Sequence, residues 1–375
     1  MLRREKILTL LVFLFLVHGT YYFLVPEDVH NNESPIKYVK YFLVLLFMGF
    51  SLNEKITEKL IFFLLWMPLA FYFNAINNEP DWVNFVGYLL PAYLLFSNET
   101  LRKINWSFVV VWVILIASLL GYVEILFLDN HFYMYNASKS DYRVVSIFLN
   151  PNNFGIVIAI LTFSFILFLE SSKYVNAIMF INGIMLVVFS GSKTALGIFV
   201  MLTIYNSYRL IRNPKLYKIK RNDVFLLPII GALLFFLLRL IINFDYSSMR
   251  TLEWETLVVR FIDYSEFMGL VENNFLFPWE DAVKNIDNIY LHLWGSFGFP
   301  ILVLFVAFNI ALFILVRSAF AALLSSVFLI IGFTTNFLYL WPLGYFYWAV
   351  TSLIFTKPYN DTQRQVEAIE IKHTN

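Results

Sequence analysis

The chain has 375 residues, of which 60% are hydrophobic and only 14% are charged, whereas soluble domains carry about 25% charged residues. The apolar residues arrive in long runs that a soluble chain could not bury, which excludes an array of two or three soluble domains. The net charge of +1 excludes a basic surface for nucleic acid. The absence of cysteine excludes disulfides, zinc thiolate sites and cysteine nucleophiles.

The apolar runs are long enough to cross a bilayer as helices, and they lack the alternation of barrel strands. They predict an all-α polytopic membrane protein with about 12 transmembrane helices, organised as a single integral membrane domain over residues 1–375. The first run follows a basic start and has no small-residue cleavage site, so we expect an uncleaved first helix. The expected spans are roughly 7–25, 37–52, 60–76, 82–97, 106–128, 147–169, 174–190, 193–209, 224–243, part of 288–316, 319–338 and 340–356.

The basic residues of the short loops predict the orientation of the chain. With the N-terminus inside, most of the 27 lysines and arginines fall on the cytoplasmic side. An even number of spans also returns residues 357–375 to the cytoplasm as a polar tail. The basic cluster of residues 209–221 is an orientation signal, or alternatively a site for lipid headgroups.

Two external segments are longer than the other loops, namely residues 129–146 and 244–287. The second is rich in apolar residues, and residues 248–268 fit an amphipathic helix that lies on the interface or caps a cavity. This helix carries Arg250 and Arg260 together with acidic residues. It is either a solvated face with local ion pairs or part of a binding site.

Further cations are expected on the same external side. Arg143 precedes the sixth span, and Lys193 lies in the tight reversal SGSK. Arg239 stands near the outer end of its apolar run, where it either snorkels to the interface or serves a function. Together with Arg250 and Arg260 they suit a polyanionic headgroup such as a pyrophosphate, because one guanidinium group can bind two of its oxygens at once.

The sixth expected span opens with FLNPNNFG, residues 148–155. Asn150 is a suitable N-cap and Pro151 suits the first turn of a helix, which explains the helix boundary. Asn152 and Asn153 would then lie in the first turn, facing the outer leaflet. There their amides could bind sugar hydroxyls or phosphate, and the helix dipole favours an anion.

The sequence NIDNIYLHLWGSFGFP, residues 285–300, precedes the tenth span. Asn288 and His292 are four residues apart, so they share a helix face, and the following glycines and proline are expected to break the helix. Asp287 is placed to accept a proton. A single histidine in an aromatic helix is often only a packed residue, and no cluster of ligands indicates a metal.

At these elements the sequence resembles the bacterial O-antigen polymerase and O-antigen ligase superfamily, which are membrane glycosyltransferases. Four elements carry the resemblance in order: FLNPNNFG, SGSKTALG at residues 190–197, the external helix that begins SMRTLEWETL, and DNIYLHLWGSFG at residues 287–298. Family members commonly have arginine where Lys193 stands. Ligases usually have His-Asn where this chain has Asp287 and Asn288, which favours a polymerase.

The resemblance implies a GT-C-like, metal-independent transferase without a cofactor in the cell inner membrane, with its active site on the periplasmic side. Its partners would be undecaprenyl-diphosphate-linked oligosaccharide, membrane lipids and a regulator of chain length. The implied catalytic residues are Arg250, Arg260, Asp287 and His292, and the implied substrate-binding residues are Arg143, Asn150, Asn152, Asn153, Lys193, Arg239 and Asn288. Two alternatives remain, a ligase that moves finished glycan to another acceptor and a flippase or transporter of lipid-linked glycans.

Overall fold

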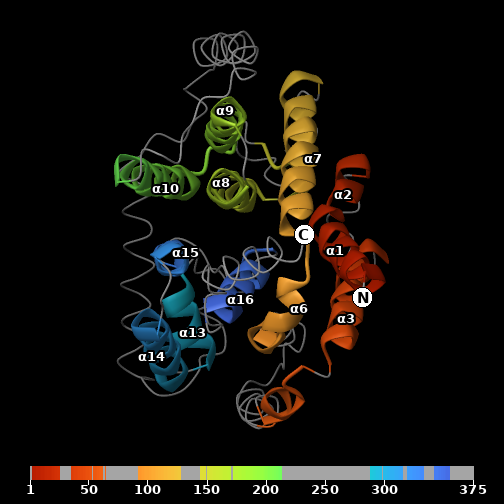
Figure 1. Ribbon diagram of the computed structural model, residues 1–375, viewed down its shortest axis with the longest axis vertical. Coiled ribbons are helices and arrows are strands. Elements are labelled where there is room, and N and C mark those ends of the chain that lie inside the picture. The colour runs from red at the N-terminus through yellow and green to blue at the C-terminus, as the bar shows by residue number, and fades with distance from the viewer. Residues whose placement is uncertain are drawn as a thin grey trace, which may run out of the picture. The chain divides into compact units, whose positions relative to one another are not determined.

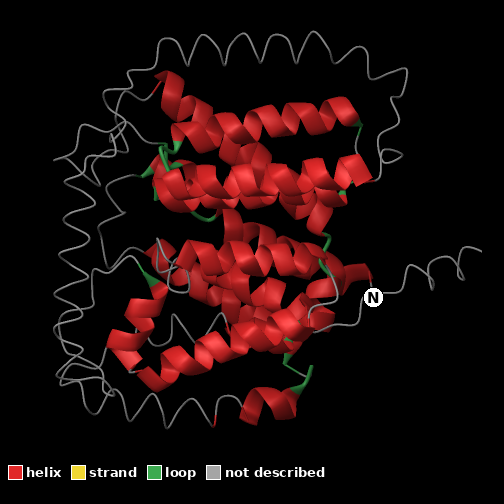
Figure 2. Cartoon of the chain, turned by 90° about the vertical axis from the view of Figure 1, so that its left-hand side faces the viewer, coloured by secondary structure: helices red, strands yellow, loops and turns green. Residues whose placement is uncertain are grey.

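The structure is a computed structural model of the chain. The described residues are 2–25, 35–52, 54–61, 64, 92–127, 144–148, 150–169, 172–212, 288–297, 299–315, 319–332 and 342–354. Within these ranges the regular secondary structure is entirely helical and contains no strand (Figure 2). The all-α prediction is therefore confirmed for the part of the chain that the structure describes.

Two helical stretches, Arg4–Leu24 and Trp106–Leu126, are long and apolar enough to cross a membrane. Other apolar helices in the described ranges are shorter, among them Pro151–Leu167 and Lys173–Phe189. The expected spans 60–76, 82–97 and 224–243 lie largely or wholly outside the described residues. The count of twelve spans stays a prediction.

The chain divides into two units, one formed by Met1–Ser51 and Lys103–Met268 and the other by Leu52–Arg102 and Gly269–Asn375. In the first unit the described helices are α1 (Leu2–Val17), α2 (Thr20–Leu24), α3 (Pro35–Ser51), α7 (Trp106–Phe127), the 3₁₀ turn η4 (Ser146–Phe148), α8 (Pro151–Phe168), α9 (Lys173–Phe189) and α10 (Lys193–Arg212). α8 packs on α9 and α10, and α1 packs on α3 and α7.

Helix α8 forms the core of the first unit. Its residues Phe154, Ile156, Val157 and Ile158 are all fully buried although they point in different directions around the helix, so the helix is enclosed on several sides. In Figure 1, α7 is seen from the side whereas α8 and α9 are seen nearly end-on. α7 therefore crosses this pair instead of running alongside it as in a bundle of parallel spans.

The expected span 7–25 is interrupted between α1 and α2. His18 Nδ1 donates a hydrogen bond to the Phe15 carbonyl oxygen at 2.7 Å, and Gly19 lies directly against the backbone carbonyl of Ile147. A side chain at position 19 would overlap that carbonyl. A segment distant in sequence therefore packs against the backbone at the point where the helical stretch is interrupted.

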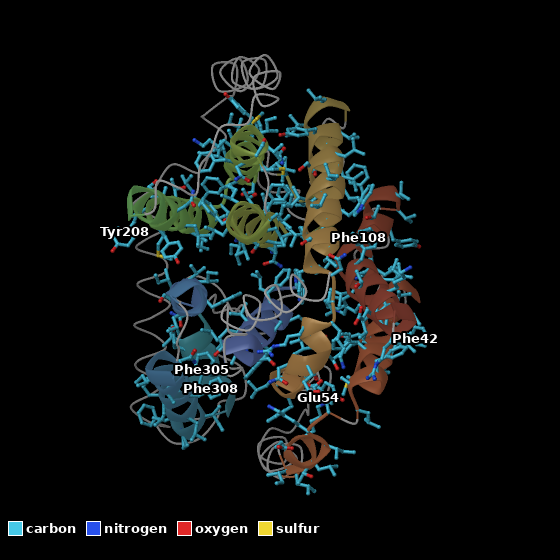
Figure 3. All side chains as sticks on the ribbon, in the orientation of Figure 1. Phe42, Glu54, Phe108, Tyr208, Phe305 and Phe308 are labelled. Atoms are coloured by element: carbon cyan, nitrogen blue, oxygen red, sulfur yellow. The ribbon has the colours of Figure 1, made fainter. Side chains whose placement is uncertain are left out.

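In the second unit the described elements are η2 (Tyr93–Phe96), α6 (Asn98–Arg102), α13 (Ile289–Phe297), α14 (Phe299–Leu315), α15 (Ala319–Gly332) and α16 (Leu343–Ile354). α16 packs against η2, α6 and α15. The hydroxyl of Tyr347 donates to Asn309 Oδ1 at 2.9 Å, and its ring packs on Phe305, which Figure 3 labels on α14. This buried pair joins α14 to α16.

The beginning of α6 is held by Glu54, also labelled in Figure 3. Its carboxylate accepts hydrogen bonds from the backbone N–H groups of Glu99 at 2.5 Å and Thr100 at 2.9 Å. Nearby, Lys59 is only 3% exposed, and its Nζ lies 4.3 Å from the centroid of the Tyr93 ring. Burial lowers the pKa of Lys59 to about 8, although Glu54 acts in the opposite direction.

The lowered pKa of Lys59 predicts a stability that depends on pH. The unfolded chain, where the lysine pKa is about 10.4, binds the proton more tightly than the folded chain does. The contribution of Lys59 to the free energy of unfolding is therefore complete above about pH 10.4 and is lost as the pH falls through about 8. The thermal midpoint of wild type minus that of Lys59→Met should therefore rise between pH 7 and pH 10 in detergent. A difference that does not change with pH would contradict the prediction.

Gly19→Ala should destabilise the first unit by about 1–3 kcal/mol, because the added methyl group overlaps the Ile147 carbonyl. Gly49→Ala is the matched control, since nothing lies within 4 Å of a Cβ built there and alanine favours helix α3. Thermal unfolding in detergent measures both. Equal midpoints for the two variants would show that the contact at Gly19 is not tight.

Candidate functional site

The FLNPNNFG element forms the start of α8 as predicted. Asn150 is the N-cap, and its Oδ1 accepts hydrogen bonds from the backbone N–H groups of Asn152 at 2.8 Å and Asn153 at 3.3 Å. Pro151 occupies the first turn, where its missing N–H costs nothing. The side chain of Asn153 is only 4% exposed, whereas Asn152 is partly exposed. Of the two amides in the first turn of α8, Asn152 is therefore the more accessible.

The SGSK reversal connects α9 to α10 through three residues, which we call the serine turn (Ser190–Ser192). Gly191 has φ 61°, a left-handed conformation that glycine adopts without strain. Ser190 is the C-cap of α9, and Ser192 Oγ accepts a hydrogen bond from the Ala195 N–H at 3.2 Å at the start of α10. Lys193 begins α10, and its side chain lies outside the described part of the structure.

These two elements pack directly against each other. A Cβ built on Gly155, in the first turns of α8, would overlap Ser190 Oγ and would lie 2.7 Å from the Cβ of Ala195. The Val144 N–H also donates to the carbonyl oxygen of Phe189, just before the serine turn, at 3.0 Å. Two motifs separated by about 40 residues thus share one junction, because glycine allows the backbones to approach closely.

A buried carboxylate that the sequence analysis did not single out borders this junction. Glu124, near the end of α7, is 7% exposed. Its Oε2 accepts hydrogen bonds from the Ser146 N–H at 2.9 Å and from the Val145 N–H at 3.3 Å. The signal that could have revealed it was an acidic residue within the otherwise apolar run of residues 106–128.

Residues 144–148, which we call the connector, lead into the FLNPNNFG element. The sequence placed residues 144–146 at the end of an external loop and began the sixth span at residue 147. In the structure, Val144 to Phe148 are all at most 8% exposed, and α8 begins only at Pro151. The helix start at Pro151 agrees with the capping prediction, whereas hydropathy alone does not reveal the turn that contacts with Glu124 and Gly19 hold just before it.

The fourth element, in the second unit, begins helix α13. Asn288 is its N-cap rather than a helical residue, since its Oδ1 accepts hydrogen bonds from the N–H groups of Tyr290 at 3.0 Å and Leu291 at 3.1 Å. The His292 N–H bonds to the Asn288 carbonyl oxygen, and the imidazole is partly exposed. The predicted break is confirmed, because α13 ends at Phe297 and α14 begins at Phe299.

The predicted phosphate-binding cations and the predicted base fall outside the described residues. These are Arg143, Arg239, Arg250, Arg260 and Asp287, together with the expected amphipathic helix 248–268. Within the described part of the first unit, the structure brings together the first two of the four elements. Across the same ranges, no group of three or more histidine, aspartate or glutamate side chains is arranged to hold a metal ion.

Comparison with protein-family models, with curated proteins and with solved structures finds no match to this chain. The resemblance of the four elements to the polymerase and ligase superfamily therefore stays a prediction from the sequence.

The junction makes a testable prediction about two glycines in the motifs. Gly155→Ala should force Ser190 and Ala195 away and lower the thermal midpoint, at a cost of about 1–3 kcal/mol. Gly197→Ala lies in the neighbouring motif with nothing within 4 Å of the added methyl group, and it should leave the midpoint unchanged or raised. If Gly155→Ala is as stable as Gly197→Ala, the two elements do not pack as described.

Proposed function

We propose that this protein is an integral membrane glycosyltransferase of the O-antigen polymerase type, which joins undecaprenyl-diphosphate-linked repeat units on the outer face of the cytoplasmic membrane. The observation that carries the proposal is the junction of the FLNPNNFG and SGSKTALG elements at Gly155 and Ser190. A shared site requires that motifs distant in sequence meet, and these two do.

The exposed faces of the described helices support the membrane location. On α7, the outward residues Phe108, Trp112, Leu115 and Leu119 are between 41% and 63% exposed. They recur at the spacing of one helix face, and the opposite face of α7 is also apolar. Phe42 on α3, labelled in Figure 3 together with Phe108, is a further example of a large apolar side chain left exposed. Exposed apolar helix faces of this kind suit lipid.

In the proposed reaction, a hydroxyl oxygen of one lipid-linked repeat unit attacks the anomeric carbon of a second. The new glycosidic C–O bond forms as the bond between the anomeric carbon and the diphosphate breaks. The polyprenyl diphosphate leaves with the electron pair, and the hydroxyl proton passes to a base. Fixed cations near the diphosphate would stabilise the charge that develops on its oxygens, which is commonly the largest contribution to catalysis.

The proposed roles follow the sequence analysis. Arg250 and Arg260 would bind the diphosphate, assisted by Lys193, Arg143 and Arg239, and Asp287 would accept the proton or orient the acceptor. The cap bonds of Asn150 and Asn288 indicate that these two asparagines act mainly by setting helix starts. Asn152, which is partly exposed in the first turn of α8, is the better candidate for a sugar contact.

A deletion strain distinguishes the polymerase from the ligase alternative. Without a polymerase, single repeat units should appear on the final acceptor, because later steps still run. Without a ligase, long glycan should accumulate on the lipid carrier. Long carrier-linked chains in the deletion strain would therefore overturn the polymerase assignment.

Purified protein in detergent separates an enzyme from a flippase. A polymerase should lengthen lipid-linked repeats into a series of longer glycans without any bilayer. A flippase moves its substrate across a bilayer, so it should produce no such series in detergent. Absence of this series with wild-type protein would count against the transferase.

Arg250→Lys and Arg260→Lys should each lower chain elongation by about 10-fold or more at normal expression, because lysine keeps the charge but loses the paired hydrogen bonds of the guanidinium. Arg102→Lys is the control, since Arg102 is an exposed residue of α6 on the expected cytoplasmic side. Gel analysis of chain length measures all three. Unchanged chain lengths in both test variants would remove these arginines from the site.

A further inference from the structure

We propose that Glu124 is a positioning residue of the transferase site, whose carboxylate fixes the connector and thereby the direction in which the chain enters the FLNPNNFG element. This inference rests on the proposed function. It concerns a residue that belongs to none of the four sequence elements.

The connector leaves the helical hydrogen-bond pattern in a buried place, so its backbone donors need other partners. Ser146 has φ 46°, a left-handed conformation that is uncommon for residues other than glycine. Its N–H donates to Glu124 Oε2 at 2.9 Å, and its Oγ donates to the Ala117 carbonyl oxygen at 2.8 Å. Both partners lie on α7, which therefore holds Ser146 through its backbone and its side chain.

The connector is also held from two other sides. The Val144 N–H bonds to the Phe189 carbonyl oxygen at the end of α9, and Gly19 packs against the Ile147 carbonyl. Of these contacts, Glu124 is the one that accepts hydrogen bonds from two consecutive backbone N–H groups of the connector, and a buried N–H left without an acceptor is costly. We therefore expect the connector to depend most on this side chain.

The position of the connector bears directly on the proposed site. The Asn150 N–H donates to the carbonyl oxygen of Phe148, the last residue of the connector, at 2.7 Å. A shift of the connector thus moves the cap of α8 and, with it, Asn152. A displacement of about 1 Å in a residue that binds substrate is sufficient to lower activity strongly.

Three variants on α7 separate positioning from general stability. Glu124→Leu removes both acceptor oxygens at similar volume, and Glu124→Gln keeps one oxygen that still accepts the N–H groups of Val145 and Ser146. Tyr122→Phe is the matched control, because it removes the hydrogen bond of 2.7 Å to Asn182 Oδ1 on α9 but does not touch the connector.

The first measurement reads the connector directly. Because the chain has no cysteine, Val145→Cys introduces a single thiol at a position that is 8% exposed. We expect maleimide to modify this thiol slowly in the otherwise wild-type and Tyr122→Phe proteins, and about 10-fold faster in Glu124→Leu, with Glu124→Gln between them. A thiol that stays protected in Glu124→Leu overturns the proposal, whatever the activity.

The second measurement uses the cysteine-free variants in the detergent elongation assay. In Glu124→Gln the KM for the lipid-linked repeat should rise about fivefold with a smaller change in kcat, and Glu124→Leu should lose about 10-fold or more of its activity. Tyr122→Phe should keep both constants even if its thermal midpoint falls. Wild-type kinetics in Glu124→Leu would also overturn the proposal.

The two measurements distinguish failure of this inference from failure of the proposed function. If wild-type protein does not elongate glycan, the proposed function fails and so does a positioning role in it. The thiol measurement then still decides whether Glu124 holds the connector.

Discussion

The first unit depends on one constraint, which is that a backbone leaving a helix inside an apolar core must find partners for its N–H and C=O groups. The chain enters α8 through a connector whose regular structure is the single 3₁₀ turn η4, which leaves the N–H groups of residues 144–146 without helical partners. Glu124 and Phe189 accept the backbone N–H groups of residues 144–146, and the Ala117 carbonyl oxygen accepts the Ser146 hydroxyl. Gly19 allows the Ile147 carbonyl to approach closely. This constraint explains why a carboxylate stands in an otherwise apolar helix.

The same constraint explains which residues of the FLNPNNFG and SGSKTALG motifs have a structural role. Asn150 and Pro151 begin α8, Gly191 reverses the chain, and Gly155 provides room for Ser190. These residues are accounted for by capping and packing without any ligand. A resemblance at these residues therefore indicates a similar way of connecting helices. The argument for chemistry depends on the other residues of the two motifs. Among the described positions of the two motifs, the strongest candidates for chemistry are Asn152 and Lys193.

Several features of the fold could be predicted from the sequence because they depend on local signals. The start of α8 followed from Asn150 and Pro151, the reversal between α9 and α10 from Ser190 to Lys193, and the break before α14 from the glycines and Pro300. Features set by tertiary contact could not be predicted in this way. The close backbone contact at Gly19 involves the Ile147 carbonyl, more than 120 residues away in the sequence.

The connector before α8 is another feature that is set by tertiary contacts and that hydropathy could not reveal. Hydropathy assigned residues 144–146 to the end of a loop and residues 147–148 to a span, and it gave no sign that Val144 to Phe148 form one buried turn. Hydropathy averages over a window, whereas burial is decided by single contacts such as the Ser146 N–H on Glu124. An acidic residue in an apolar run is costly unless it is satisfied, so the sequence of α7 by itself implies that Glu124 has a partner. That partner is the backbone of the connector, which places a structural requirement directly beside the motif on which the proposed chemistry depends.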